Sequence, residues 1–169
     1  NQHSNIKIVN TIYADWLKDK AQDMVKDILK EHPKVDVIFA QNDAMAYGAY
    51  KAAKELNIEG IKFVGVDGLW GYEGGLELVK NGILSGTFTC STGGKEAIRY
   101  AIDIFNHESG IPKKIILRST QVTAANVDNY IDENNKSHLE ETTEKEKITV
   151  GFSQVGSETE WRIANTNSI

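Results

Sequence analysis

The sequence has one cysteine, no long apolar run and no concentration of positive charge, and each absence excludes a class of protein. Cys90 has no second thiol to pair with, so an internal disulfide is excluded. Cysteine usage therefore indicates neither an oxidising nor a reducing compartment. No stretch reaches the ~18 apolar residues that cross a bilayer, and NQHSNIK lacks the regions of a signal peptide. We therefore expect a soluble segment without direct membrane contact, with any targeting signal outside it.

Other scarcities exclude further functions. The net charge is −5 at pH 7 and no basic stripe is present, so nucleic acid is not an expected partner. The four histidines are scattered and form no ligand-spaced pair with cysteine, which leaves metal binding and metal catalysis without support. The glycines of DGLWGYEGG lack the spacing of a dinucleotide-binding loop. We therefore predict a segment that is not an enzyme and that holds no cofactor and no metal.

What is present is an alternation of short apolar runs and helical patterns. NIKIVNT is extended and precedes the amphipathic LKDKAQDMVKDILKEH, which Pro33 closes, while VDVIFA, IKFVGV and GTFTC each lead through a polar turn into a helix. Continuous apolar runs are typical of strands buried on both faces. The order predicts an α/β fold: an open, doubly wound, mostly parallel sheet of four or five strands with helices on both faces. We expect a last strand in KKIILRST and a short helix in TAANVDNYI, with Thr123 as its N-cap.

The chain is expected to divide into three parts. Residues 1–131 form one lobe; residues 132–147, DENNKSHLEETTEKEK, are a charged linker; residues 148–169 contain an apolar strand, a turn and the start of a helix. This last part is an orphan βα unit that cannot bury its own apolar face. It should therefore dock on the lobe or on another chain, which makes self-association an expected interaction.

Polar and aromatic side chains follow the predicted strands where each strand ends. They are Trp16 after the first, Asn42 and Asp43 after the second, Asp67 after the third, and Cys90, Ser91 and Thr92 after the fourth. In an open parallel sheet these carboxyl ends face the crevice where ligands bind. Simpler roles stay open: Asn42, Asp43, Ser91 and Thr92 as helix caps, Asp67 as a turn residue, Trp16 as a core aromatic. Together, an indole with Asn and Asp side chains suits a sugar.

The stretch VDVIFAQNDAMAYGAYKAAKELNI followed by KFVGVDG resembles the C-terminal lobe of type I periplasmic binding proteins, the ribose-binding and lactose-repressor-like group. The resemblance covers residues 5–131. It implies that Asn42 and Asp67 hold sugar hydroxyls and that Trp16 closes on the sugar ring. Ribose binders have a glutamine at the position of Cys90, which counts against ribose itself.

The tail ITVGFSQVGSETEWR resembles the opening of the N-terminal lobe in the same family, in particular that of galactofuranose-type binders. The resemblance implies that Trp161 and Arg162 face a cleft beside a strand-end loop of Ser153 and Gln154. The two resemblances together imply a larger parent protein with tandem binding modules. We expect this segment to belong to the extracytoplasmic or periplasmic sensory region of such a membrane protein, for example a sensor histidine kinase. Its expected partners are a monosaccharide and the missing N-terminal lobe of its own module.

Two other readings of the function stay open at this point. The segment could be the effector-binding lobe of a lactose-repressor-like regulator, or part of a transport solute-binding protein. A phosphoacceptor receiver domain is disfavoured, because the first strand ends in NTIYAD without an acidic pair and the lysines Lys113 and Lys114 precede the last strand.

Overall fold

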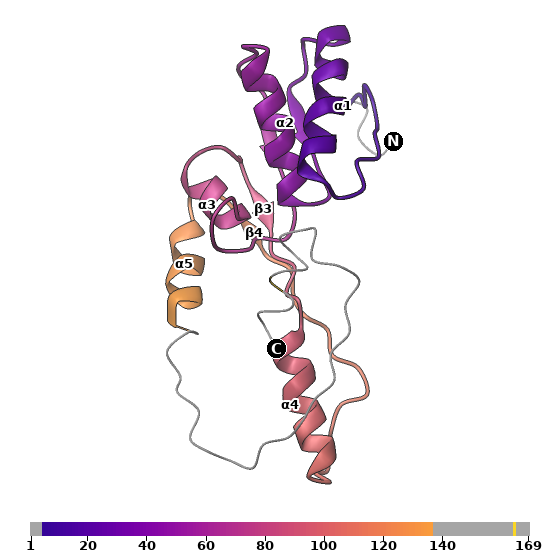
Figure 1. Ribbon diagram of the computed structural model, residues 1–169. Coiled ribbons are helices and arrows are strands. Elements are labelled where there is room, and N and C mark those ends of the chain that lie inside the picture. The colour runs from indigo at the N-terminus through magenta and orange to yellow at the C-terminus, as the bar shows by residue number, and fades with distance from the viewer. Residues whose placement is uncertain (1–4, 137–163, 165–169) are drawn as a thin grey trace.

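The computed structural model describes residues 5–136 and residue 164 (Figure 1). The elements are α1 (Lys18–Glu31), β1 (Val37–Phe39), α2 (Asp43–Glu55), β2 (Lys62–Val64), α3 (Gly75–Lys80), β3 (Thr87–Phe88), α4 (Gly94–Phe105), β4 (Gln121–Val122) and α5 (Val127–Lys136). The predicted alternation of strands and helices is confirmed from α1 onward. Most of the predicted linker, and the predicted second unit with Ser153, Gln154, Trp161 and Arg162, lie outside the described residues.

The strands form two short pairs that are joined side by side. β1 and β2 are parallel, with Ile38 opposite Phe63, and β3 and β4 are antiparallel. Two isolated parallel bridges connect the end of β2 to β3, one from Val64 to Gly86 and one from Asp67 to Thr89. The order along the sheet is thus β1, β2, β3, β4. The prediction of four or five parallel strands was wrong, because three strands run in parallel and the last runs the other way.

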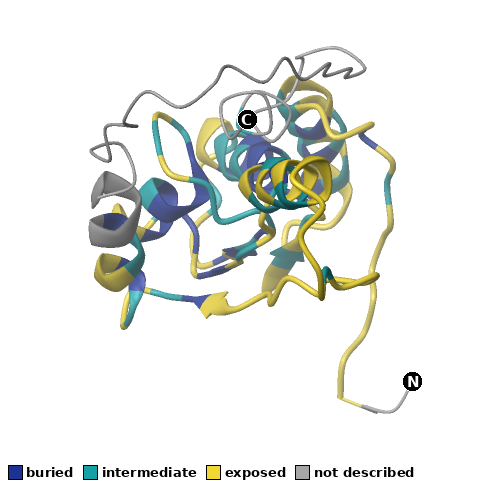
Figure 2. Cartoon of the chain, turned by 90° about the horizontal axis from the view of Figure 1, so that it is seen from below, coloured by how far each residue is buried: buried dark blue, intermediate teal, exposed yellow. Residues whose placement is uncertain are grey.

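Both ends of the predicted sheet differ from the prediction. Residues 5–11, the expected first strand, pair with neither sheet, and Ile6 and Ile8 are exposed. The segment near the N-terminus is accordingly coloured as exposed over most of its length (yellow, Figure 2). The predicted last strand at 113–120 is also absent, and pairing starts one residue later at Gln121. A strand is stable only where a neighbouring strand takes its backbone hydrogen bonds. Apolar patterning predicts an extended backbone but not the partner that this requires.

Helices α1 and α2 pack closely against each other along their lengths. The predicted apolar face of α1 buries Ala21, Val25 and Leu29, whereas Leu17 precedes the helix and is exposed. The facing side of α2 is built from buried alanines and Gly48. A β-carbon at Gly48 would lie 2.2 Å from the carbonyl oxygen of Lys18, so glycine is required for this close approach.

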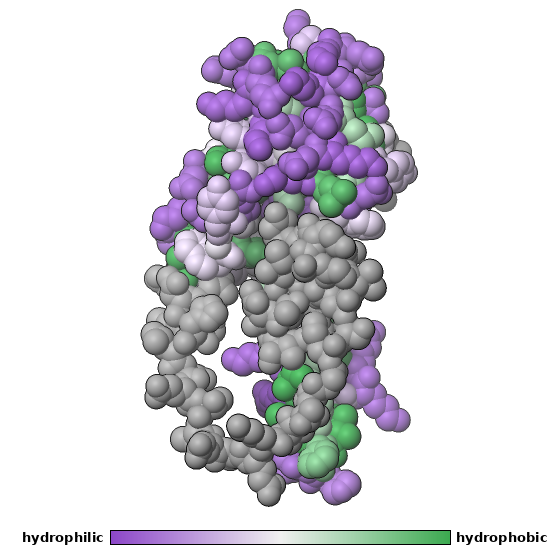
Figure 3. All heavy atoms as spheres, in the orientation of Figure 1, coloured by the Kyte–Doolittle hydropathy of each residue, from purple (hydrophilic) through white to green (hydrophobic). Residues whose placement is uncertain are grey.

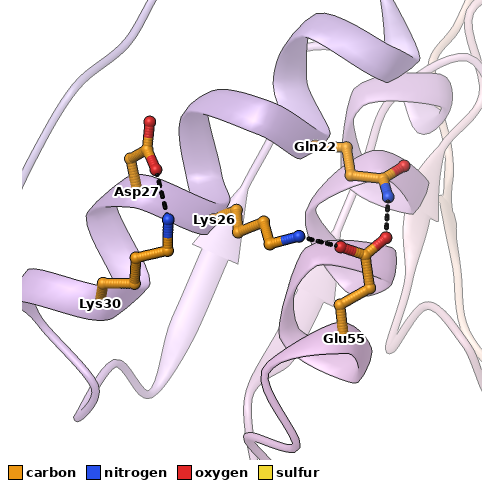
Figure 4. A network of polar contacts seen from close by, with 5 residues as sticks. All are labelled: Gln22, Lys26, Asp27, Lys30 and Glu55. Atoms are coloured by element: carbon orange, nitrogen blue, oxygen red, sulfur yellow. Dashed lines mark hydrogen bonds and ion pairs between the residues drawn. The ribbon is translucent and has the colours of Figure 1, made fainter.

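A polar network joins α1 and α2 on their outer side (Figure 4). The Lys26 ammonium and the Gln22 amide both donate to the carboxylate of Glu55, and Lys30 donates to Asp27 with an Nζ–Oδ1 distance of 2.8 Å. The hydrogen bond and positive charge of Lys26 lower the pKa of Glu55. Because these groups are exposed to solvent, the network adds only modestly to the hydrophobic packing.

One face of the sheet is left uncovered at β1. Ile38 and its partner Phe63 point into the core, but Val37 and Phe39, which point the other way, are 55% and 59% exposed. The prediction of helices on both faces was therefore wrong for the described residues at this strand. In parallel sheets an apolar strand face is normally covered by packing, so covering elements are missing from residues 5–136.

Helix α4 stands apart from the rest of the lobe (Figure 1). Of its residues only Gly94 is buried, and Ile104 and Phe105 are 61% and 67% exposed. Apolar side chains gather at this end of the molecule, where α4 lies (green, Figure 3). The helix is strongly amphipathic in sequence, so it carries an apolar face that no described element covers.

Helix α5 closes the described lobe against α3. The prediction of Thr123 as the N-cap was wrong, because the helix begins only at Val127. Thr123 instead closes the preceding turn, where its carbonyl accepts from the Val127 N–H at 3.0 Å and its hydroxyl accepts from the Ala125 N–H at 3.4 Å. The helix continues to Lys136, past the boundary expected at residue 131. Among the described helices, none combines the length and the apolar character needed to cross a bilayer.

Candidate ligand-binding edge

Of the predicted site residues that the structure describes, Asn42, Asp67 and Cys90 lie at the carboxyl ends of β1, β2 and β3, and Trp16 is bonded to Asn42. The side-chain amide of Asn42 donates to the Trp16 carbonyl at 3.1 Å, the Gly68 N–H donates to the Asp43 carboxylate at 2.8 Å, and the Cys90 N–H donates to the Asp67 carbonyl at 2.9 Å. Each bond joins one loop to the next. The prediction that these residues share one edge of the sheet is confirmed.

Asn42 is the N-cap of α2, as its alternative reading proposed. Its backbone is extended and its Oδ1 accepts from the Met45 N–H at 2.8 Å, while its Nδ2 holds the Trp16 loop. The residue is buried. An asparagine amide has two protons and two acceptor lone pairs, so one N–H and one lone pair remain after these bonds.

Trp16 is a surface residue and not a core aromatic. Trp16 and Asp15 both have left-handed backbone conformations, with φ of 59° and 52°, and this turn projects the indole outward. Its side chain is 58% exposed. The ring is therefore open to solvent, as an aromatic that stacks on a sugar must be, and the backbone carbonyl of the same residue is bonded to Asn42.

Asp43 is placed differently from the prediction. Its carboxylate turns inward, where Oδ2 accepts from the Gly68 N–H at 2.8 Å and Oδ1 accepts from the Thr87 hydroxyl at 2.6 Å. The residue is only 4% exposed. Burial of a charged group requires such hydrogen bonds in compensation. We therefore assign Asp43 to the support of the edge and not to its open surface.

Asp67 has the most unusual backbone of the row, with φ of 117°. Its N–H donates to the Phe88 carbonyl at 2.9 Å, and its own carbonyl accepts from Cys90, so β3 holds the strained residue in place. With Asp43 and Glu73 it lines a small cavity of about 10 Å³, room for about one water molecule. Non-glycine residues in such conformations cost about 1–3 kcal/mol and cluster at functional sites.

The loop after β3 is more open. Cys90 is exposed and its thiol is free. Ser91 accepts from the Gly93 N–H at 3.3 Å, but the N-cap of α4 is Gly93 itself, with φ of 73° and no side-chain cap. The alternative reading of Ser91 and Thr92 as helix caps was therefore wrong. A backbone at positive φ explains glycine at the cap position.

One contact near the edge was missed from the sequence. Lys18, in the first turn of α1, forms an ion pair with Glu73 and lies 5.9 Å from the ring centre of Tyr47. The pair ties α1 to the loop that contains the exposed Trp70 and Tyr72. Burial, and then the negative charge of Glu73, raise the pKa of Tyr47. The aromatic residues among the glycines of DGLWGYEGG are the sequence signal for this loop, whereas the glycine spacing alone does not indicate it.

The described residues contain no group of three or more His, Cys, Asp and Glu side chains that could hold a metal ion. An α/β lobe whose polar and aromatic side chains gather at the carboxyl edge of its sheet belongs to the class of ligand-binding lobes. The family of the periplasmic binding protein domain matches residues 1–109. The chain belongs to this family.

Two curated relatives show how much of a binding protein is present. A xylitol-binding protein of Mycolicibacterium smegmatis is 37% identical over 87 residues, which are 51% of this chain and 24% of that protein. The fructose import binding protein of Bifidobacterium longum is 27% identical over 139 residues, 80% of this chain and 41% of that protein. The chain therefore spans less than half the length of these relatives.

Solved structures agree with this fold. The fructose-binding periplasmic domain of a hybrid two-component system superposes with a TM-score of 0.74 at 33% identity, covering 82% of this chain and 46% of that one. A periplasmic solute-binding protein of an ABC transporter from Actinobacillus succinogenes, with bound D-allose, superposes with a TM-score of 0.69 at 29% identity, covering 76% and 46%. In both cases about half of the related domain has a counterpart here.

Proposed function

We propose that this chain is a sugar-recognition lobe of an extracytoplasmic receptor, in which the edge formed by Trp16, Asn42, Asp67 and Cys90 contacts a monosaccharide or a related polyol. The segment binds and does not catalyse. It belongs to the periplasmic sensory region of a membrane-bound signalling protein such as a sensor histidine kinase.

The observation that carries this proposal is the hydrogen-bonded row along the sheet edge. Asp67 can accept from two neighbouring hydroxyls of a sugar, and Asn42 can donate one hydrogen bond and accept one. The exposed indole of Trp16, whose backbone carbonyl is bonded to Asn42, can cover the apolar C–H face of the ring. The names of relatives support the same ligand class, since they include binders of xylitol, fructose and D-allose.

The uncovered apolar surface of α4 supports the proposal that a second lobe completes the site. The two chain segments that lead to α4 and back are tied at their base, where the Thr89 N–H donates to the Thr120 carbonyl at 2.9 Å and the Thr120 N–H to the Thr89 hydroxyl at 2.9 Å. We infer that α4 packs into the missing N-terminal lobe of the same module. These two segments then connect the lobes across the ligand.

The sensor is preferred over the two other readings because of one comparison. The fructose-binding domain that superposes on 82% of this chain is part of a hybrid two-component system. A transport protein is the second candidate, since the D-allose complex belongs to an ABC transporter. A ribose operon repressor of Halalkalibacterium halodurans is 38% identical over 61 residues, a shorter match.

Titration of the ¹⁵N-labelled chain with D-fructose, D-allose, xylitol and myo-inositol tests the proposal by NMR. Because half of the polar contacts come from the other lobe, we expect dissociation constants in the millimolar range or weaker, which correspond to about −4 kcal/mol. The shifts should be confined to the Gly68 and Cys90 amides and the Trp16 indole.

Two variants of the same residue type make this test specific. Asp67→Ala should abolish the sugar-dependent shifts, because hydrogen bonds to a charged group contribute about 1.5–3 kcal/mol. Asp23→Ala, an exposed aspartate on α1, should leave them unchanged. Shifts away from this edge, equal binding by the Asp67 variant, or micromolar affinity in the absence of the second lobe would each contradict the proposal.

A further inference from the structure

The buried carboxylate of Asp43 joins three segments that are distant in sequence. Asp43 begins α2, Gly68 follows Asp67 in the turn after β2, and Thr87 lies in β3 and is fully buried. The backbone of Asp67 is thereby held on both sides, by Asp43 through the Gly68 N–H and by β3 through Phe88 and Cys90. The carboxylate and β3 together define where the strained turn lies.

Two glycines make room for this carboxylate. A β-carbon at Gly65 would lie 2.1 Å from Oδ1 of Asp43, and one at Gly75 would lie 1.9 Å from Oδ2. Neither glycine has a positive φ, so backbone conformation does not require glycine at either position. The space needed by the carboxylate explains both residues. The position of Asp43 is thus built into the segment that follows β2 and into the start of α3, as well as into α2.

We propose that Asp43 is a positioning residue that sets the Asp67–Gly68 turn, and through this turn the presentation of Asp67 to a ligand hydroxyl. The first part of this inference concerns the turn alone, and the second part rests on the proposed sugar-binding function. Asp43 does not itself contact the ligand, because its side chain is enclosed and its two oxygens bond to Gly68 and Thr87.

The chemistry of the two bonds provides a conservative replacement. The Gly68 N–H can only donate, whereas the Thr87 hydroxyl can donate or accept. Asparagine at position 43 can therefore keep both bonds, with its carbonyl accepting from Gly68 and its amide donating to Thr87. Alanine keeps neither bond, and leaves the buried Thr87 hydroxyl and the partly buried Gly68 N–H without this partner.

Hydrogen exchange of the Gly68 amide, followed by NMR on the full chain, tests the positioning role. In Asp43→Ala this exchange should accelerate ~10-fold or more relative to the amides of Val25 and Leu29 in α1, because the acceptor is lost. Asp43→Asn should restore it to within ~3-fold of the original rate. Gly68 exchange that is unchanged in Asp43→Ala, or not restored in Asp43→Asn, would overturn the proposal.

Thr87→Val covers the case in which Asp43→Ala does not fold, because it removes one bond with almost no change of volume. The Gly68 amide should then exchange ~2- to 5-fold faster, and an unchanged rate would overturn the proposal. Titration with D-fructose separates the two parts. If the original chain shows no sugar-dependent shift, the proposed function fails, while the exchange data still decide the role of Asp43. If the original chain does show such shifts, Asp43→Ala should weaken sugar binding ~10-fold and Asp43→Asn should weaken it less than 3-fold.

Discussion

Because the backbone of Asp67 is strained, we predict that the usual order of stability between alanine and glycine variants is reversed at this position. Alanine normally stabilises a protein relative to glycine, because glycine loses more conformational freedom on folding, by about 0.5–1 kcal/mol. At position 67, φ is 117°, a conformation that residues with a β-carbon rarely adopt. We expect Asp67→Gly to be more stable than Asp67→Ala. Both variants lack the aspartate side chain, so its own contacts cancel in the comparison.

The magnitude follows from two opposing terms. Holding alanine in this conformation costs about 1–3 kcal/mol. The entropy of glycine in the unfolded chain opposes this by about 0.5–1 kcal/mol. The difference in the free energy of unfolding should therefore be about 1 kcal/mol in favour of glycine. The backbone hydrogen bonds of residue 67 to Phe88 and Cys90 are available to either variant and should keep the backbone where it is.

Urea denaturation monitored by circular dichroism at 25 °C measures this difference, with equal slopes for the two variants as a check on the comparison. The matched control is Asp23 in α1, an exposed aspartate with a helical backbone. There Asp23→Ala should be more stable than Asp23→Gly by about 1 kcal/mol, the usual order in a helix. An Asp67→Ala variant that is as stable as Asp67→Gly would refute the claim that this backbone is strained.

Two further predictions concern parts of the chain away from the edge. The pKa of Glu55 is lowered by its hydrogen bond with Lys26, so its stabilising effect is present above the ordinary glutamate pKa of 4.5 and is lost as the pH falls through the lower folded pKa. Glu55→Gln should thus lower the melting temperature at pH 7 but not at the acid end of a pH series; an equal decrease at both ends would exclude this ion pair as the cause. Deleting residues 137–169, which leaves α5 intact, should preserve the circular dichroism spectrum of the folded lobe but change its association state in analytical ultracentrifugation; loss of the lobe's fold would show that the tail belongs to this domain and would exclude the tandem-module reading.

The sequence predicted the helices better than the sheet, for a physical reason. A helix satisfies its backbone hydrogen bonds within one segment, so the periodicity of α1 and the cap at Asn42 are local signals. A strand depends on a neighbour that can be far away in the sequence. NIKIVNT has the pattern of a strand but pairs with none of the described strands, and the reversal of β4 has no local signal.

The candidate site was predictable in its location but not in the direction of its side chains. Loops that follow parallel strands must gather at one edge, so Asn42, Asp67 and Cys90 were placed correctly. Whether a carboxylate points outward or inward depends on side chains from other elements. For Asp43 the deciding partners are Thr87 and the room left by Gly75, which no spacing around residue 43 reveals.

The contact between Gly48 and the carbonyl of Lys18 has a consequence for how the binding edge can change in evolution. The two helix backbones are in direct contact there, so no side chain lies between the helices that could change its conformation to accommodate a larger residue. A residue larger than glycine at position 48 must displace the first turn of α1, which carries Lys18 and adjoins Trp16. The position of the Trp16 turn can therefore be adjusted by a substitution at the interface between α1 and α2, without any change in the residues proposed to contact a ligand.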